Sequence, residues 1–138
     1  MKIEDIVSVS GLPGLYKIIT SRTNGLIVED IDTQKNKFVS VRKHQFTPLG
    51  TVAIYTESDT TEINEVFEAM RAMAVDGLEP PSHKGNSKEL FNYFAEVLPD
   101  YDRDQVLVSD VKKVIKWYNF LTQRDLFPFE KSDTGEEE

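Results

Sequence analysis

Three carboxylates stand at alternate positions in residues 100–104, DYDRD, as they do where a calcium-binding EF-hand loop begins. Such a loop also needs a glycine at its sixth position and a glutamate at its twelfth, where this sequence has Gln105 and Val111. We therefore predict a solvated turn, in which Asp100 or Asp102 accepts hydrogen bonds from nearby amides. We assign no metal ligands to this segment.

Other groups that enzymes use for catalysis are scarce. No cysteine is present, which excludes thiol catalysis, disulfides and cysteine metal sites. The two histidines, His44 and His83, stand far apart and lack zinc-ligand spacing. Residues 11–14, GLPG, precede a predicted strand instead of following one, so they are not a phosphate-binding loop. We assign no catalytic residues and no cofactor, and we predict that the protein is not an enzyme.

The charge is unevenly distributed along the 138 residues, whose formal net charge is −8. Residues 1–50 carry seven basic and five acidic side chains, whereas residues 51–79 carry one basic and seven acidic side chains. A broadly basic nucleic-acid coat is therefore excluded, and adhesion to anionic membranes is disfavoured. No apolar run approaches the roughly 20 residues of a membrane span, and the first residues lack a signal-peptide core. We expect a cytoplasmic protein that binds no membrane.

Residues 14–56 have the composition of short strands joined by tight turns. The expected strands span residues 16–20, 26–31, 38–42 and 52–56. Asn24-Gly25 is a strong hairpin signal, residues 47–50, TPLG, predict a turn, and residues 4–9 are compatible with a short helix or a strand. This pattern predicts a small, strongly bent antiparallel barrel of the SH3-like type.

Three helices are expected in the remainder of the chain. The first spans residues 59–75, where Asp59 and Glu62 have the spacing of a capping box. Its apolar stripe is expected to close the barrel. The other two are expected at residues 88–98, with Ser87 as the N-cap, and from about residue 109 to about residue 124.

The fold class that we predict is therefore α+β, with a small helical subdomain after the barrel. Residues 77–87 contain two prolines and two glycines, which is typical of a linker. The predicted parts are the barrel with its closing helix at 1–76, the linker at 77–87, the helical subdomain at 88–130 and a disordered acidic tail at 131–138.

Aromatic residues are concentrated in the helical part, where nine of the fourteen lie between residues 91 and 129. Two helices cannot easily bury all of them, and exposed aromatic side chains mark protein interfaces. The candidate interface residues are Tyr93, Trp117, Phe120 and Phe127. The alternatives are that Phe127 and Phe129 fold back to cover the others, or that they pack on the barrel.

Basic residues offer a second kind of surface. The candidate nucleic-acid face on the barrel consists of Lys17, Lys37, Arg42 and Lys43. Phe38 and Phe46 lie among them, as aromatic side chains do where bases stack, although a small barrel more often needs such residues in its core. In the third expected helix, Lys112, Lys113 and Lys116 form a basic edge, which is either a solvated face or a reader of nucleic acid.

Several segments resemble an uncharacterised family from Bacteroidetes-type bacteria. The resemblance is carried by residues 6–17, 24–29, 52–56, 101–113 and 117–118, and it extends over roughly residues 3–125. It implies a bacterial cytoplasmic protein with a β-rich first part and a helical second part. It implies no activity and no catalytic residues.

Together these features favour a non-enzymatic interaction module that binds a protein partner or assembles with itself. The alternative is an accessory protein that binds RNA or DNA through a basic face of the barrel. A contiguous apolar patch would support the first function, and convergence of the basic side chains on one face would support the second.

Overall fold

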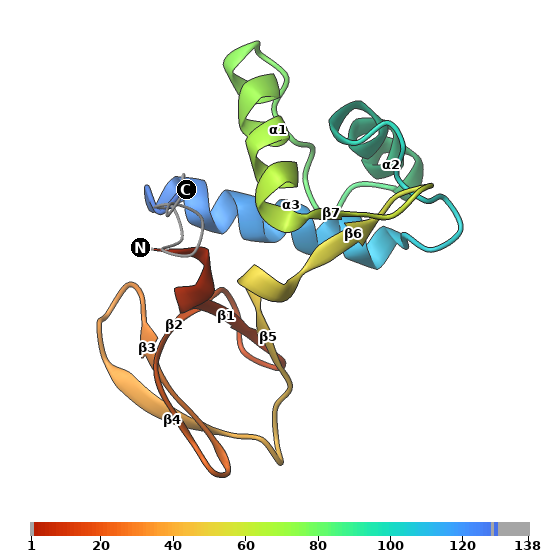
Figure 1. Cartoon of the computed structure of the whole chain (residues 1–138). Helices are drawn as coiled ribbons and strands as arrows, with labels where there is room; N and C mark the ends of the chain where they lie inside the picture. Colours follow the sequence, from red (N-terminus) through yellow and green to blue (C-terminus); the bar gives the residue numbers. More distant parts are fainter. Residues whose placement is uncertain (1, 128, 130–138) are drawn as a thin grey trace, which may run out of the picture. The chain divides into compact units, whose positions relative to one another are not determined.

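The computed structural model describes residues 2–127 and residue 129, and the predicted acidic tail 131–138 lies outside them. The chain divides into two compact units, whose elements are labelled in Figure 1. One unit contains the described residues up to Val52 together with Leu126, Phe127 and Phe129, and the other runs from Ala53 to Asp125. The division that the sequence predicts after residue 76 differs from this one, which assigns the first long helix to the second unit.

The first unit contains a five-stranded antiparallel sheet with the strand order β4-β3-β2-β1-β5. Its elements are the 3-10 helix η1 (Ile3–Asp5), β1 (Ile6–Val9), β2 (Tyr16–Arg22), β3 (Gly25–Asp30), β4 (Asn36–Ser40), β5 (Phe46–Pro48) and the 3-10 helix η2 (Leu49–Thr51). Residues 4–9, compatible with helix or strand in the sequence, form parts of both η1 and β1. The last strand returns to pair with the first, so β1 has a neighbour on each side.

The predicted hairpin at residues 24–25 is confirmed, with a shift of one residue. Arg22 pairs with Gly25, so Thr23 and Asn24 form the two-residue turn between β2 and β3. The ring of Phe38 in β4 lies over Gly25, because a Cβ atom at Gly25 would come within 2.8 Å of its Cζ atom. The absence of a side chain at this position therefore lets an aromatic ring cover the backbone.

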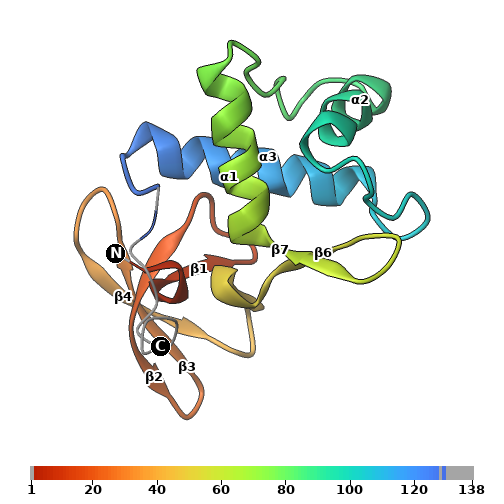
Figure 2. The same cartoon turned by 45° about the horizontal axis from the view of Figure 1, so that its top comes forward.

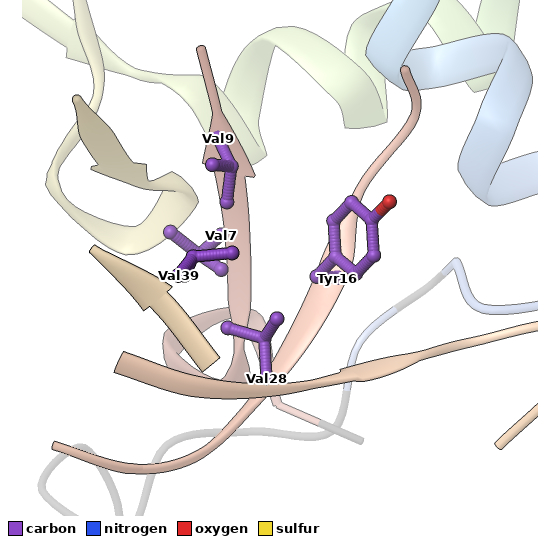
Figure 3. Packing of buried hydrophobic residues seen from close by; sticks show 5 residues of the cluster. All are labelled: Val7, Val9, Tyr16, Val28 and Val39. Carbon is purple, nitrogen blue, oxygen red and sulfur yellow. The ribbon is translucent and has the colours of Figure 1, made fainter. Parts of the chain in front are cut away.

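One cluster of buried side chains in the first unit lies on one face of the sheet. Figure 3 shows its five buried side chains, which are Val7, Val9, Tyr16, Val28 and Val39. They come from β1, β2, β3 and β4, and the partly buried residues that pack against them are Leu12, Ile18, Leu26 and Phe46. A register shift between Ile18 and Thr20 marks a bulge in β2, and such a bulge bends a strand.

A closed barrel is not found in the described part of the chain, where the sheet ends at β4 on one side and at β5 on the other. One turn prediction is wrong, and one segment correctly predicted as a strand belongs to a different sheet. Phe46–Pro48, which overlaps the predicted turn, forms β5, and Pro48 is tolerated because β5 is an edge strand. Ala53–Tyr55 does not join this sheet, because it pairs with Thr60–Glu62 in a hairpin of the second unit.

The second unit consists of that hairpin and three helices. Its elements are β6 (Ala53–Tyr55), β7 (Thr60–Glu62), α1 (Ile63–Val75), α2 (Ser87–Val97) and α3 (Val108–Gln123). In Figure 2, α3 passes behind the middle of α1, and α2 lies beside the first half of α3. Among the described residues, no helix combines the length and apolar character that crossing a bilayer requires.

The capping box predicted at the start of the first long helix is wrong. Thr60–Glu62 is strand β7, and α1 begins only at Ile63, where Glu62 gives no side-chain cap. The backbone carbonyl of Asp59 instead accepts a hydrogen bond of 2.9 Å from the Thr56 N–H in the hairpin turn. The strand pairing, which local sequence does not specify, thus overrides a helix-start pattern.

The second and third helices lie where the sequence predicts them, within a residue or two. In α2 the N-cap is Asn86 in place of the predicted Ser87, because the Asn86 side chain accepts a hydrogen bond of 2.8 Å from the Glu89 N–H. The apolar faces of the three helices supply the core. Its fully buried side chains include Phe67, Met70, Leu90, Phe94, Ile115 and Leu121.

Candidate interaction surfaces

The four aromatic residues predicted as a protein interface do not share one environment. Tyr93 in α2 and Phe127 are buried, whereas Trp117 and Phe120 in α3 are partly exposed. The Phe120 ring is covered by the guanidinium of Arg124, whose Cζ lies 3.7 Å from the ring centroid. Phe127 belongs to the first unit and the other three residues to the second. Trp117 is therefore the one of these four residues whose ring is neither buried nor covered by Arg124.

The four predicted basic residues of the sheet unit do not share one face either. Lys17 is paired with Glu29, whereas Lys37 is paired with Val28 of the core face. Since neighbouring residues of a strand point to opposite faces, Lys17 and Lys37 lie on opposite faces of the sheet. The Lys37 ammonium lies 5.5 Å from the Tyr16 ring centroid. Arg42 and Lys43 lie in the exposed turn that follows β4.

The prediction of a hydrogen-bonded turn at residues 100–104 is confirmed. The Asp102 carboxylate accepts hydrogen bonds from the N–H groups of Asp104 at 2.8 Å and Gln105 at 3.2 Å. The Arg103 guanidinium lies over the Tyr101 ring, 4.3 Å from its centroid, and donates to the Tyr101 carbonyl. The described residues contain no group of three histidine or carboxylate side chains that could hold a metal ion.

An apolar row crosses the face of the sheet opposite the core. Ile27 is paired with Thr20 on one side and with Phe38 on the other, and Ile19 adjoins Thr20 at the bulge. Phe38 is 46% exposed and Ile19 is 44% exposed, so the expectation that Phe38 belongs to the core is wrong. The alternation predicted over residues 38–42 holds only within β4, where Val39 points inward, whereas Val41 lies in the turn after the strand and is 57% exposed. The pattern alone could not tell which of the two faces is buried.

The strand that carries Phe38 is also an open edge of the sheet. The Val41 N–H donates to the Asn24 carbonyl and the Asp30 N–H to the Lys35 carbonyl, both at 2.9 Å. With the antiparallel register, these bonds make Ile27–Phe38 a non-hydrogen-bonded pair. The backbone N–H and C=O of Phe38 therefore point away from β3, toward the edge.

One buried hydroxyl in the second unit lacks a hydrogen bond. The Tyr93 Oη is buried and has no partner among the described residues. Burial, and to a smaller extent the neighbouring Tyr118 and Glu79, raise the pKa of Tyr93 well above its ordinary range. The neutral hydroxyl is therefore the form present at physiological pH.

Replacing Tyr93 by phenylalanine is expected to raise the free energy of unfolding by about 1 kcal/mol, because it removes a buried polar group that has no partner. Chemical denaturation followed by far-UV circular dichroism measures this change. Tyr55→Phe is the control, since Tyr55 is half exposed and its hydroxyl is expected to contribute less than about 0.5 kcal/mol. A loss of stability in Tyr93→Phe would mean that the hydroxyl is hydrogen-bonded after all.

Two family patterns match consecutive parts of the chain. The family described as "Domain of unknown function (DUF5606)" matches residues 3–49, and "Domain of unknown function (DUF6852)" matches residues 52–121. The junction between them, at residues 50–51, lies close to the boundary of the two units at Val52 and Ala53. No curated protein is significantly similar to the chain.

A solved structure shares the architecture. A solution NMR structure from Bacteroides vulgatus, determined as a structural-genomics target, has a TM-score of 0.77 and 37% sequence identity to this chain. The similarity covers 92% of this chain and 90% of that one. The predicted resemblance to an uncharacterised Bacteroidetes-type family, with a β-rich first part and a helical second part, is thus confirmed. The chain belongs to this family of proteins built from two domains of unknown function.

Proposed function

We propose that the protein is a non-enzymatic interaction module that associates with a second copy of itself through strand β4. The observation that carries the proposal is the edge position of this strand, with the exposed Phe38 at its centre. The outward backbone groups of Phe38 provide a template for pairing with another strand. The apolar row beside it adds surface that is stabilised when water is removed.

The sequence of β4 is compatible with pairing to itself. In an antiparallel arrangement about a two-fold axis at Phe38, this ring lies opposite Phe38 of the second copy, and Asn36 lies opposite Ser40. Lys37 then lies opposite Val39, so no two like charges meet. The Lys37 ammonium lies over the Tyr16 ring of its own sheet. Its side chain therefore does not block the edge at which a second strand would pair.

The interface formed by two paired β4 strands is small, because β4 has five residues. We therefore expect weak association, with a Kd on the order of 0.1 mM. Sedimentation equilibrium over a range of protein concentrations measures it. Phe38→Lys is expected to weaken association at least about tenfold, because it places two ammonium groups side by side across this interface.

The matched control is Ile19→Lys. Ile19 is almost as exposed as Phe38 and lies on the same face, but its strand is internal to the sheet. This variant is expected to associate like the wild type. If Phe38→Lys unfolds, Asn36→Pro removes an N–H that points to the edge and keeps the Phe38 ring. A wild-type chain that stays monomeric at about 1 mM, or a dimer that tolerates Phe38→Lys, would refute the proposal.

We also infer that the sheet is an open form of a small SH3-like barrel. This inference is supported by the return of β5 to β1, by the bulge in β2 and by the hydrophobic cluster on one face of the sheet. The open side between β4 and β5 leaves the edge on which the proposed self-association depends.

A further inference from the structure

The exposed side of α3 carries a cluster of three lysines. Lys112 and Lys116 are four residues apart, and Lys113 and Lys116 three, so the three ammonium groups project from one side of the helix. In the described part of the chain none of them forms an ion pair. Asp110 is the one acidic residue of α3, and its carboxylate accepts a hydrogen bond of 2.9 Å from the Leu107 N–H. We call Lys112, Lys113, Lys116 and Trp117 the α3 surface.

The connection between α1 and α2 adds one cation, Lys84, and a neutral imidazole, His83, to the α3 surface. Partial burial lowers the pKa of His83, and the positive charges of Lys116, Lys84 and Lys112 lower it further. The imidazole therefore lies within electrostatic reach of two ammonium groups of α3. His83 and Lys84 belong to a turn that is separate from α3 in sequence, so the basic surface is built from two segments.

The α3 surface also contains an aromatic ring. Trp117 is partly exposed and lies one helical turn after Lys113. A row of cations beside an accessible aromatic ring is the combination that single-stranded nucleic acids recognise, because the phosphates pair with the cations and a base stacks on the ring. An acidic peptide would use the cations and leave the ring without a partner.

We propose that the α3 surface, with His83 and Lys84, binds single-stranded nucleic acid. About three phosphates can contact the lysines, so log K should fall with log salt with a slope of about −2. Because the whole chain carries a net charge of −8, binding is expected to be weak at physiological salt and to rely on this local surface. The proposal is independent of self-association, because β4 belongs to the other unit.

The test is fluorescence anisotropy of a labelled oligothymidylate of roughly 12 nucleotides, titrated with the full chain at about 50 mM salt. The double variant Lys112→Gln/Lys116→Gln is expected to weaken binding at least about tenfold. Arg42→Gln/Lys43→Gln removes the same charge from an exposed turn of the first unit, and it is expected to change binding by less than about twofold. Circular dichroism checks that both variants remain folded.

Trp117 gives a second measurement, since it is the only tryptophan in the chain. Its fluorescence is expected to be quenched by the oligonucleotide, and Trp117→Leu, which keeps an apolar side chain, should weaken binding about tenfold. Absence of binding at low salt, or an equal loss in both double variants, would overturn the proposal. Displacement of the oligonucleotide by polyglutamate at the same charge concentration would also overturn it, because the surface would then recognise charge alone.

Discussion

Replacing Phe67 by alanine is expected to lower the free energy of unfolding by about 3–5 kcal/mol. Phe67 lies in α1 and is completely buried, and its ring centroid is 6.2 Å from that of Tyr118 in α3. Truncation therefore removes a large apolar side chain at a contact between two helices and leaves a cavity that the surrounding core fills only in part.

Urea denaturation followed by the fluorescence of Trp117 measures this loss, because the only tryptophan belongs to the same unit as Phe67. Val75→Ala is the matched control, since Val75 ends the same helix and is 80% exposed. It is expected to change stability by less than about 0.5 kcal/mol. A loss below about 1 kcal/mol in Phe67→Ala would show that this ring is not part of a packed core.

Replacing Gly25 by alanine is expected to destabilise the sheet unit by about 3 kcal/mol. The added Cβ would collide with the backbone carbonyl of Val39 and approach the Phe38 ring to 2.8 Å. A side chain can change its rotamer, but the carbonyl belongs to the ladder between β3 and β4. The collision can therefore be relieved only by separating these strands.

Gly50→Ala is the control for this substitution. The nearest atom to a Cβ at Gly50 is the Cγ of Glu4 at 3.5 Å, which is an ordinary contact. Alanine there reduces the conformational freedom of the unfolded chain, so the variant should be as stable as the wild type or more stable by about 0.5 kcal/mol. Thermal unfolding followed by far-UV circular dichroism compares the two. Equal effects in both variants would show that the β3–β4 ladder leaves room for a side chain at Gly25.

The helices could be predicted from the sequence because their signals are local. Apolar residues such as Phe94 and Ile115 recur with the helical period, and the polar residues before α2 identify its start to within one residue. The β2–β3 hairpin was predictable for the same reason, since a two-residue turn fixes the register of its strands.

The strand pairings could not be predicted in this way, because a strand's partner is set by contacts far away in sequence. The β-rich segment Ala53–Tyr55 has the composition of a further strand of the first sheet, yet it pairs with Thr60–Glu62. Val9 pairs with Phe46, which is far away in the sequence, and the local sequence of neither segment predicts this pairing. Local propensity identifies such segments as strands and leaves their place in a sheet open.

The candidate surfaces were predictable only in part. The basic edge of α3 follows from the spacing of Lys112, Lys113 and Lys116, but the sequence gives no sign that His83 lies close to it. The alternation of β4 predicts that Phe38 and Val39 point to opposite faces, but it does not predict which face is buried. Val39 packs in the core, so Phe38 lies on the exposed face.

The discontinuity of the sheet unit has a consequence for how the protein forms during synthesis. Residues up to Val52 leave the ribosome early, whereas Leu126 and the buried Phe127 of the same unit follow only after all of the second unit. Domains fold as the chain emerges, beginning at the N-terminus. The five strands, which all lie between Ile6 and Pro48, can therefore pair before the helices are made, whereas Leu126 and Phe127 join the first unit only after them.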